Sequence, residues 1–240
     1  MSATAMVMGN SLPGRAPRAV APAWHTGVVL FCLFGFSLLG ALRHDWLGTG
    51  DRARVANYVL IIAFEWVLVA FISGAARRRG VSLRELVGGR WARAIDVLRD
   101  LGIGIGFLIG AGALLQGLSY LVKPAPSKAL LEFLPHGAAQ MMLWVCMSLT
   151  AGFCEEVIFR GYLQRQFAAL TQGAIGGIVL QGVVFGASHG YQGWKLMMII
   201  SVFGMMFGML AYWVRSLRPG MLAHFLQDGI GGIAGRRLMG

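Results

Sequence analysis

Residues 137–167 read GAAQMMLWVCMSLTAGFCEEVIFRGYLQRQF. The run from Gly137 to Cys154 contains no charged residue, and two adjacent carboxylates, Glu155 and Glu156, follow it directly. A run of this kind is typical of a transmembrane helix, which needs about 20 mainly apolar residues. Ionisable side chains in or beside such a segment are costly and usually mark a functional site. The stretch therefore predicts a membrane helix that carries a chemical site.

The composition of the whole chain indicates a membrane protein. Its 240 residues are 57% hydrophobic and only 13% charged, with a mean hydropathy of +0.66, whereas soluble domains are about 25% charged. The fold class that we expect is all-α, a polytopic transmembrane helix bundle of about seven spans, with a range of six to eight. The expected spans cover residues 19–42, 55–76, 101–122, 137–154, 166–188 and 196–214, with a weaker seventh at 221–235.

The net charge of +11 is explained by topology. The basic residues fall between apolar spans, so no basic surface domain remains for a nucleic-acid partner. The loop 77–99 has seven arginines and should be cytoplasmic, because cytoplasmic loops of membrane proteins are enriched in Lys and Arg. Counting spans outward from this loop places the N terminus in the cytoplasm. We expect a multi-pass protein of the plasma membrane, with N-terminal helices and a basic loop in residues 1–136 and a helical catalytic core in residues 137–240.

Glu65 is the only acid inside the apolar spans before residue 123. It is expected to pair with an arginine of another helix or to line a cavity. The three cysteines, at positions 32, 146 and 154, lie in apolar segments without C-x-x-C spacing, so neither a disulfide framework nor a thiolate metal site is indicated.

Glu156 and Arg160 lie four residues apart, so on a helix they share one face in the favourable order for an ion pair. Glu155 is rotated from Glu156 by about 100° at 3.6 residues per turn. One acid can therefore be neutralised structurally while the other faces elsewhere. The competing interpretation is that both acids simply cap a solvated helix end.

His189 lies at the depth of Glu155 if the chain forms an antiparallel helical hairpin. With the turn centred on Gln172 in TQGAIGG, Glu155 lies 17 residues before the centre and His189 lies 17 after it. Because an α-helix rises about 1.5 Å per residue, equal offsets mean equal depth. His224 and Asp228 are again four residues apart, so both project from one helix face toward the same region.

These three pairs resemble the signature of the CAAX-prenyl protease and bacteriocin-processing (CPBP) intramembrane protease family, type II CAAX endopeptidase group. The motifs are E-E-x-x-x-R at 155–160, F-x-x-x-H at 185–189 and H-x-x-x-D at 224–228. Their order and separation match the family, and the resemblance covers about residues 137–235. A three-part pattern is far more specific than any one motif.

The resemblance implies a glutamate-dependent intramembrane endopeptidase that acts on a membrane-associated or lipidated peptide or protein, with membrane lipid as its surroundings. Glu155 and His189 would activate water, and His224 with Asp228 would stabilise the oxyanion. Glu156, Arg160 and Phe185 would support the site. An ionised aspartate at 228 cannot donate a hydrogen bond, so Asp228 must be protonated or must orient His224. No cofactor is expected.

Two other interpretations stay open. In the first, Glu155, His189, His224 and Asp228 bind zinc and the protease is metal-dependent, although the H-E-x-x-H spacing is absent. In the second, the protein is not an enzyme but a proton- or ion-coupled transporter or a non-catalytic immunity or partner-binding membrane protein. A transporter predicts paired broken helices in two related halves, whereas the polar groups here cluster in the second half.

Overall fold

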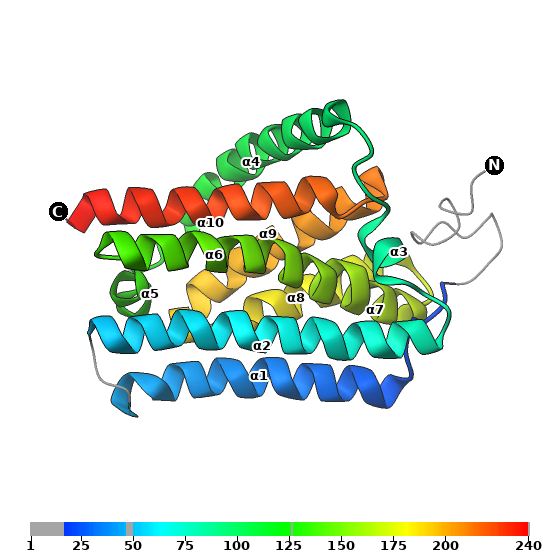
Figure 1. Cartoon of the computed structure of the whole chain (residues 1–240), viewed down its shortest axis with the longest axis horizontal. Coiled ribbons are helices and arrows are strands. Elements are labelled where there is room, and N and C mark those ends of the chain that lie inside the picture. The colour runs from blue at the N-terminus through cyan, green and yellow to red at the C-terminus, as the bar shows by residue number, and fades with distance from the viewer. Residues whose placement is uncertain (1–16, 47–49, 126, 240) are drawn as a thin grey trace.

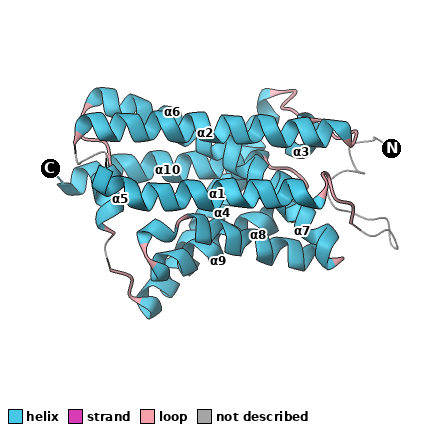
Figure 2. Ribbon diagram, turned by 90° about the horizontal axis from the view of Figure 1, so that it is seen from below, coloured by secondary structure: helices cyan, strands magenta, loops and turns pink. Residues whose placement is uncertain are grey.

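The computed structural model describes residues 17–46, 50–125 and 127–239. Over these ranges the chain is helical and contains no strand, as Figure 2 shows, so the expected all-α class is confirmed. In chain order the elements are α1 (Ala23–Trp46), α2 (Asp51–Arg78), α3 (Leu83–Val87), α4 (Ala94–Val122), α5 (Lys128–Phe133), α6 (Ala138–Glu155), the π-helical η2 (Glu156–Leu163), α7 (Gln164–Thr171), α8 (Ala174–Ser188), the 3-10 turn η3 (Gly190–Gln192), α9 (Trp194–Val214) and α10 (Arg218–Met239).

Five helical segments in the described part of the chain are long and apolar enough to cross a membrane. They cover Ala23–Leu42, Asp51–Arg78, Ala94–Val122, Ala138–Thr171 and Trp194–Val214. The shorter apolar helix α8 has 15 residues, and α10 contains the expected weak seventh segment. The bundle thus agrees with the predicted polytopic architecture.

The predicted boundaries of the fourth and fifth spans were wrong. Helix α6 does not end at Cys154 but continues through η2 and α7 to Thr171, and the predicted span 166–188 is broken by a turn at Gln172 and Gly173. No proline interrupts residues 138–171, so nothing in the backbone ends the helix earlier. The chain turns at Gln172, which has a left-handed conformation with φ of 54°.

The α6–η2–α7 helix lies at the centre of the bundle (Figure 1). It packs against α2 on one side and α10 on the other, while α7 pairs with α8 and α8 pairs with α9. Its apolar stretch is the most deeply buried of the five candidate spans. The two adjacent carboxylates therefore lie on the helix that is most enclosed by the others.

Small residues allow α8 and α9 to pack closely. A Cβ atom on Gly186 would overlap Ser201 Oγ and the Met197 carbonyl oxygen of α9. Gly204 of α9 meets Phe185 and the Gly182 backbone of α8 in the same way. Such stripes let helix backbones approach each other in membranes. This contact holds the helix that carries His189 against its neighbour.

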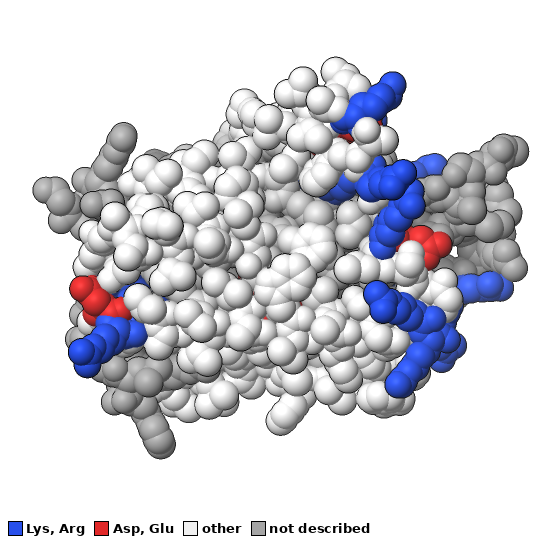
Figure 3. Space-filling model, in the orientation of Figure 1, with Lys and Arg blue, Asp and Glu red and all other residues white. Residues whose placement is uncertain are grey.

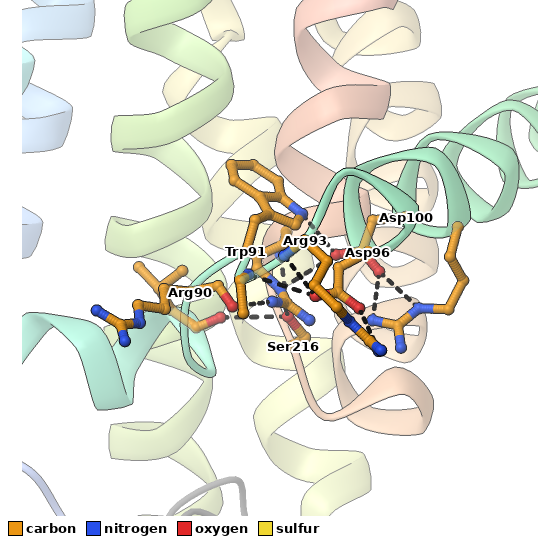
Figure 4. A network of polar contacts seen from close by, with 10 residues as sticks. Arg90, Trp91, Arg93, Asp96, Asp100 and Ser216 are labelled. Carbon is orange, nitrogen blue, oxygen red and sulfur yellow. Dashed lines mark hydrogen bonds and ion pairs between the residues drawn. The ribbon is translucent and has the colours of Figure 1, made fainter.

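Basic side chains gather at the end of the bundle where α2 ends and α4 begins (Figure 3). The seven arginines of the 77–99 loop are all exposed there. Next to them, Asp100 is fully buried and accepts hydrogen bonds from Trp91 Nε1 at 2.8 Å and Arg99 at 2.8 Å, and it pairs with Arg218 Nε at 3.1 Å. Figure 4 shows this network, which fastens the loop before α4 to the start of α10.

Candidate active site

Glu156 and Arg160 form the buried ion pair that their spacing predicts. Arg160 Nη1 lies 2.8 Å from Glu156 Oε1, and both side chains are almost fully enclosed. The Arg160 guanidinium also donates to the Gly204 carbonyl oxygen at 3.2 Å and lies over the rings of Phe185 and Phe207, 4.4 and 4.9 Å from their centroids. The Glu156 carboxylate, the Gly204 carbonyl oxygen and the two aromatic rings together stabilise the buried positive charge of Arg160, which would otherwise be costly.

The pair lies in the π-helical turn η2 rather than in a regular α-helix. Such π-bulges are rare and occur frequently at functional sites. Here the turn begins at Glu156, directly after Glu155. The two adjacent acids thus lie where the chain changes from α-helix to π-helix. No residue pattern in the sequence predicted this change.

His224 of α10 joins the two acids. Its Nδ1 lies 3.1 Å from Glu156 Oε1, the same oxygen that Arg160 contacts. An oxygen that accepts from the Arg160 guanidinium is an acceptor, so His224 Nδ1 donates to it. Sequence reasoning assigned Glu156 to Arg160 alone and missed this second contact, which fixes the orientation of the imidazole.

The other nitrogen of His224 faces two carboxylates from different helices. His224 Nε2 lies 3.6 Å from Glu155 Oε2 and 3.6 Å from Asp228 Oδ2. The side chains of Glu155 and Asp228 are 17% and 27% exposed, against 1% for Glu156. The first two acids are therefore partly exposed, and the third is sealed inside the protein. The geometry separates the adjacent glutamates into an accessible group and a sealed one.

His189 stands at the C-terminal end of α8. Its Nδ1 lies 2.8 Å from the Phe185 carbonyl oxygen, and since a carbonyl oxygen only accepts, Nδ1 carries the proton. Nε2 is then the basic nitrogen of the neutral ring. The F-x-x-x-H spacing has a physical reason here, because a residue four positions earlier presents its carbonyl to the imidazole.

The expected meeting of Glu155 and His189 is not a direct contact. Among the described residues, no hydrogen bond or ion pair joins them. The turn at Gln172 is where the hairpin argument put it, but that argument assumed regular α-helix on both sides, and the π-helical turn η2 changes the rise between Glu155 and the turn. The ring of Phe185 lies between the two histidines, 5.0 Å from that of His189 and 6.1 Å from that of His224.

A metal centre finds no ready-made ligand set in the part of the chain that the structure describes. No three His, Cys, Asp or Glu side chains are grouped there as metal ligands. His224 Nδ1 and His189 Nδ1 both contact oxygen atoms of the protein, which leaves the two Nε2 atoms as the nitrogens that could reach a metal. Of the four residues of the zinc interpretation, Glu155 and Asp228 lie 3.6 Å from His224 Nε2, whereas no hydrogen bond or ion pair joins His189 to them.

The arrangement agrees with what comparison of the sequence with known families finds. Residues 137–230 match the family described as type II CAAX prenyl endopeptidase Rce1-like. This part of the chain is similar to the CAAX protease family. No curated protein and no solved structure matches the chain. The match of the CAAX protease family indicates a protease, and therefore a hydrolase, in a multi-pass membrane protein. The matched residues contain all three sequence motifs.

Proposed function

We propose that the protein is an intramembrane endopeptidase in which Glu155 is the general base. The observation that supports this most is the contact of His224 Nε2 with Glu155 and Asp228, each at 3.6 Å. The opposite nitrogen, Nδ1, donates to Glu156, which is paired with Arg160. Of the two adjacent acids, only Glu155 is both partly exposed and without an ion pair to an arginine. A general base needs that freedom to accept a proton.

In the proposed reaction, a water molecule bridges Glu155 and the basic Nε2 of His189. A general base can act through one water, so the lack of direct contact between these side chains suits the role. Glu155 takes a proton from the water, and the water oxygen forms a bond to the peptide carbonyl carbon. The same proton then passes to the leaving amine nitrogen as the C–N bond breaks. The products are a carboxylic acid and an amine.

His224 would stabilise the negative charge on the carbonyl oxygen. Its Nδ1–H is bound by Glu156, and the two carboxylates near Nε2 favour a proton on that nitrogen also. An imidazolium placed before the reaction is a preorganised donor for an oxyanion. Asp228 would then orient His224 and favour its protonated form, so Asp228 need not donate a hydrogen bond itself.

The substrate class follows from the family and the surroundings of the site. We expect a peptide or lipidated protein that reaches the enzyme from the membrane, because the core helices are apolar on their outer faces. The exposed arginines of the 77–99 loop gather at one end of the bundle. We place that end in the cytoplasm of a cell with a plasma membrane, and the N terminus with it.

The test is cleavage by the purified protein of a prenylated peptide ending in a CAAX sequence, with its unlipidated twin, followed by mass spectrometry. Glu155→Gln keeps the shape but accepts no proton, so the rate should fall by about 10² to 10⁴ without loss of fold. His189→Ala should be similarly defective, and the double variant little worse than either. Glu85→Gln, at a partly exposed helix-capping acid, is the matched control. Rapid turnover by Glu155→Gln would contradict the assignment.

A further inference from the structure

Glu65 is a buried acid outside the part of the chain that matches the protease family. It lies in the middle of α2 with 5% of its surface exposed. One turn away on its own helix stand Ile61 and Val69, which are apolar. Among the described residues Glu65 forms no ion pair with a basic group, so the arginine partner that the sequence allowed is not found there.

Its neighbours are acids and a thiol. Helix α2 packs against α6, the Glu65 carboxyl group faces that of Glu155, and one oxygen of each is buried without a hydrogen-bond partner. Asp228 and Cys154 are the other titratable groups that face it. His224 lies beside Glu155 and Asp228, but no basic side chain of the described residues forms an ion pair with Glu65 itself.

Two ionised carboxylates that face each other in a buried place repel each other. Each would be acceptor-only, and with both ionised, Glu65 Oε2 and Glu155 Oε2 are left buried without a hydrogen-bond donor. Like charges at this distance disfavour double ionisation, as in carboxylate pairs that share a site. A single proton between the groups removes the repulsion and supplies the missing donor.

We propose that Glu65 shares one proton with Glu155 and is a positioning residue for the general base, an inference that rests on the proposed function. The protonated Glu65 donates a hydrogen bond to the Glu155 carboxylate, which fixes its orientation in an otherwise apolar helix contact. Glu155 stays ionised and takes the proton from water, while Glu65 keeps its own proton throughout. The N-terminal half of the chain thereby contributes a side chain to the site of the C-terminal half.

Three variants separate this role from a structural one. Glu65→Gln replaces the protonated acid by an amide that still donates a hydrogen bond, so it should keep kcat within a few-fold of the wild type. Glu65→Leu removes the donor, and kcat should fall about 10- to 100-fold with KM unchanged, as for groups that orient site residues in metalloenzymes. Ser73→Ala is the matched control, because Ser73 is a buried, unpartnered hydroxyl two turns along α2.

Stability measurements show whether a lost rate reflects lost fold. A buried acid without an ion pair is costly to the fold, so Glu65→Leu should unfold at the same temperature as the wild type or higher. Equal kcat in Glu65→Leu and the wild type would overturn the proposal. Loss of activity in Glu65→Gln equal to that in Glu65→Leu would overturn it too, since the donor would then not matter.

Infrared difference spectroscopy tests the shared proton without any substrate. The wild type should show the C=O stretching band of a protonated carboxylic acid, shifted in D₂O, and the band should disappear in Glu65→Gln. Its presence unchanged in Glu65→Gln contradicts the shared proton. If the wild type cleaves no peptide, the proposed function fails while the band still decides the protonation of Glu65. If Glu155→Gln is inactive but Glu65→Leu is not, only the role of Glu65 fails.

Discussion

At the scale of single residues, Arg160 pairs with Glu156 directly and, through Glu156, supports the position of His224. It neutralises Glu156, whose second bond goes to His224. Arg160→Ala should lower the free energy of unfolding by about 3–5 kcal/mol, the usual loss when one partner of a buried pair is removed. Activity should fall with it. Thermal unfolding in detergent measures the effect, with the exposed Arg84→Ala as the control.

A second variant separates charge from shape at this pair. Glu156→Gln together with Arg160→Met removes both buried charges and keeps an acceptor for His224 Nδ1, so much of the stability should return. If instead Arg160→Ala is fully stable and inactive, Arg160 has a direct catalytic role and the structural assignment is wrong.

Metal dependence is the next test at this scale. The proposed reaction uses only side chains and water, so the purified protein should hold no stoichiometric zinc and should keep its activity after dialysis against a chelator. Metal analysis and the cleavage assay measure both. Loss on chelation with recovery on addition of zinc would move Glu155, His189, His224 and Asp228 to the role of ligands.

Residue spacing predicted some of these contacts and could not predict others. The four-residue spacing of Glu156 and Arg160, and of His224 and Asp228, follows from helix periodicity alone, and both contacts are present. The hydrogen bond between His224 and Glu156 joins residues 68 positions apart in the sequence, so no local sequence pattern predicts it. Glu65 stood out as a misplaced acid, but its partner depends on how α2 packs on α6.

At the scale of elements, the sequence predicted the positions of the helices better than the residues at which they end. The first three expected spans lie within α1, α2 and α4 or begin a few residues before them. The boundary at Cys154 failed because a change from apolar to polar residues was taken as the end of a helix, whereas the polar groups are buried against other helices. The π-helical turn arises from this tertiary packing, which periodicity does not encode.

Glycines that repeat every four residues favour close helix packing, and the chain has two such repeats, at 102–110 and 204–208. Gly102, Gly106 and Gly110 repeat every four residues, yet a Cβ atom on any of them meets nothing within 4 Å. Gly104, between them, faces the Pro219 carbonyl oxygen of α10 at 3.0 Å. The repeat was a correct sign for Gly204 and wrong for the α4 triplet. Which face packs is decided by the partner helix.

This difference gives a prediction for the α8–α9 contact. Gly186→Ala places a methyl group against the α9 backbone and should destabilise the protein by about 1–3 kcal/mol, as overpacking does. His189 would shift with α8, so the cleavage rate should also fall, even at temperatures where the variant stays folded. Gly102→Ala is the control, and it should be neutral or stabilising by up to about 1 kcal/mol. Equal unfolding temperatures for both variants would contradict the close packing.

At the scale of the whole molecule, charge and topology act together. The exposed arginines of the 77–99 loop lie at one end of the bundle, and the buried Asp100 network holds this loop to α10, the helix that carries His224 and Asp228. The basic loop therefore has a structural function besides orientation. Composition predicted the orientation signal, but not that the loop is fastened to the helix of the third motif.

The orientation itself is testable by cysteine labelling. Arg84→Cys lies in the basic loop, and Ala125→Cys lies beyond the end of α4 at the opposite end of the bundle; both positions are exposed. Because the basic loop should face the cytoplasm, a membrane-impermeant maleimide should label Ala125→Cys in intact cells and Arg84→Cys only in inverted membrane vesicles. The wild type gives the background, since its cysteines lie in apolar helices. Labelling of Arg84→Cys in intact cells would reverse the topology and place the N terminus outside.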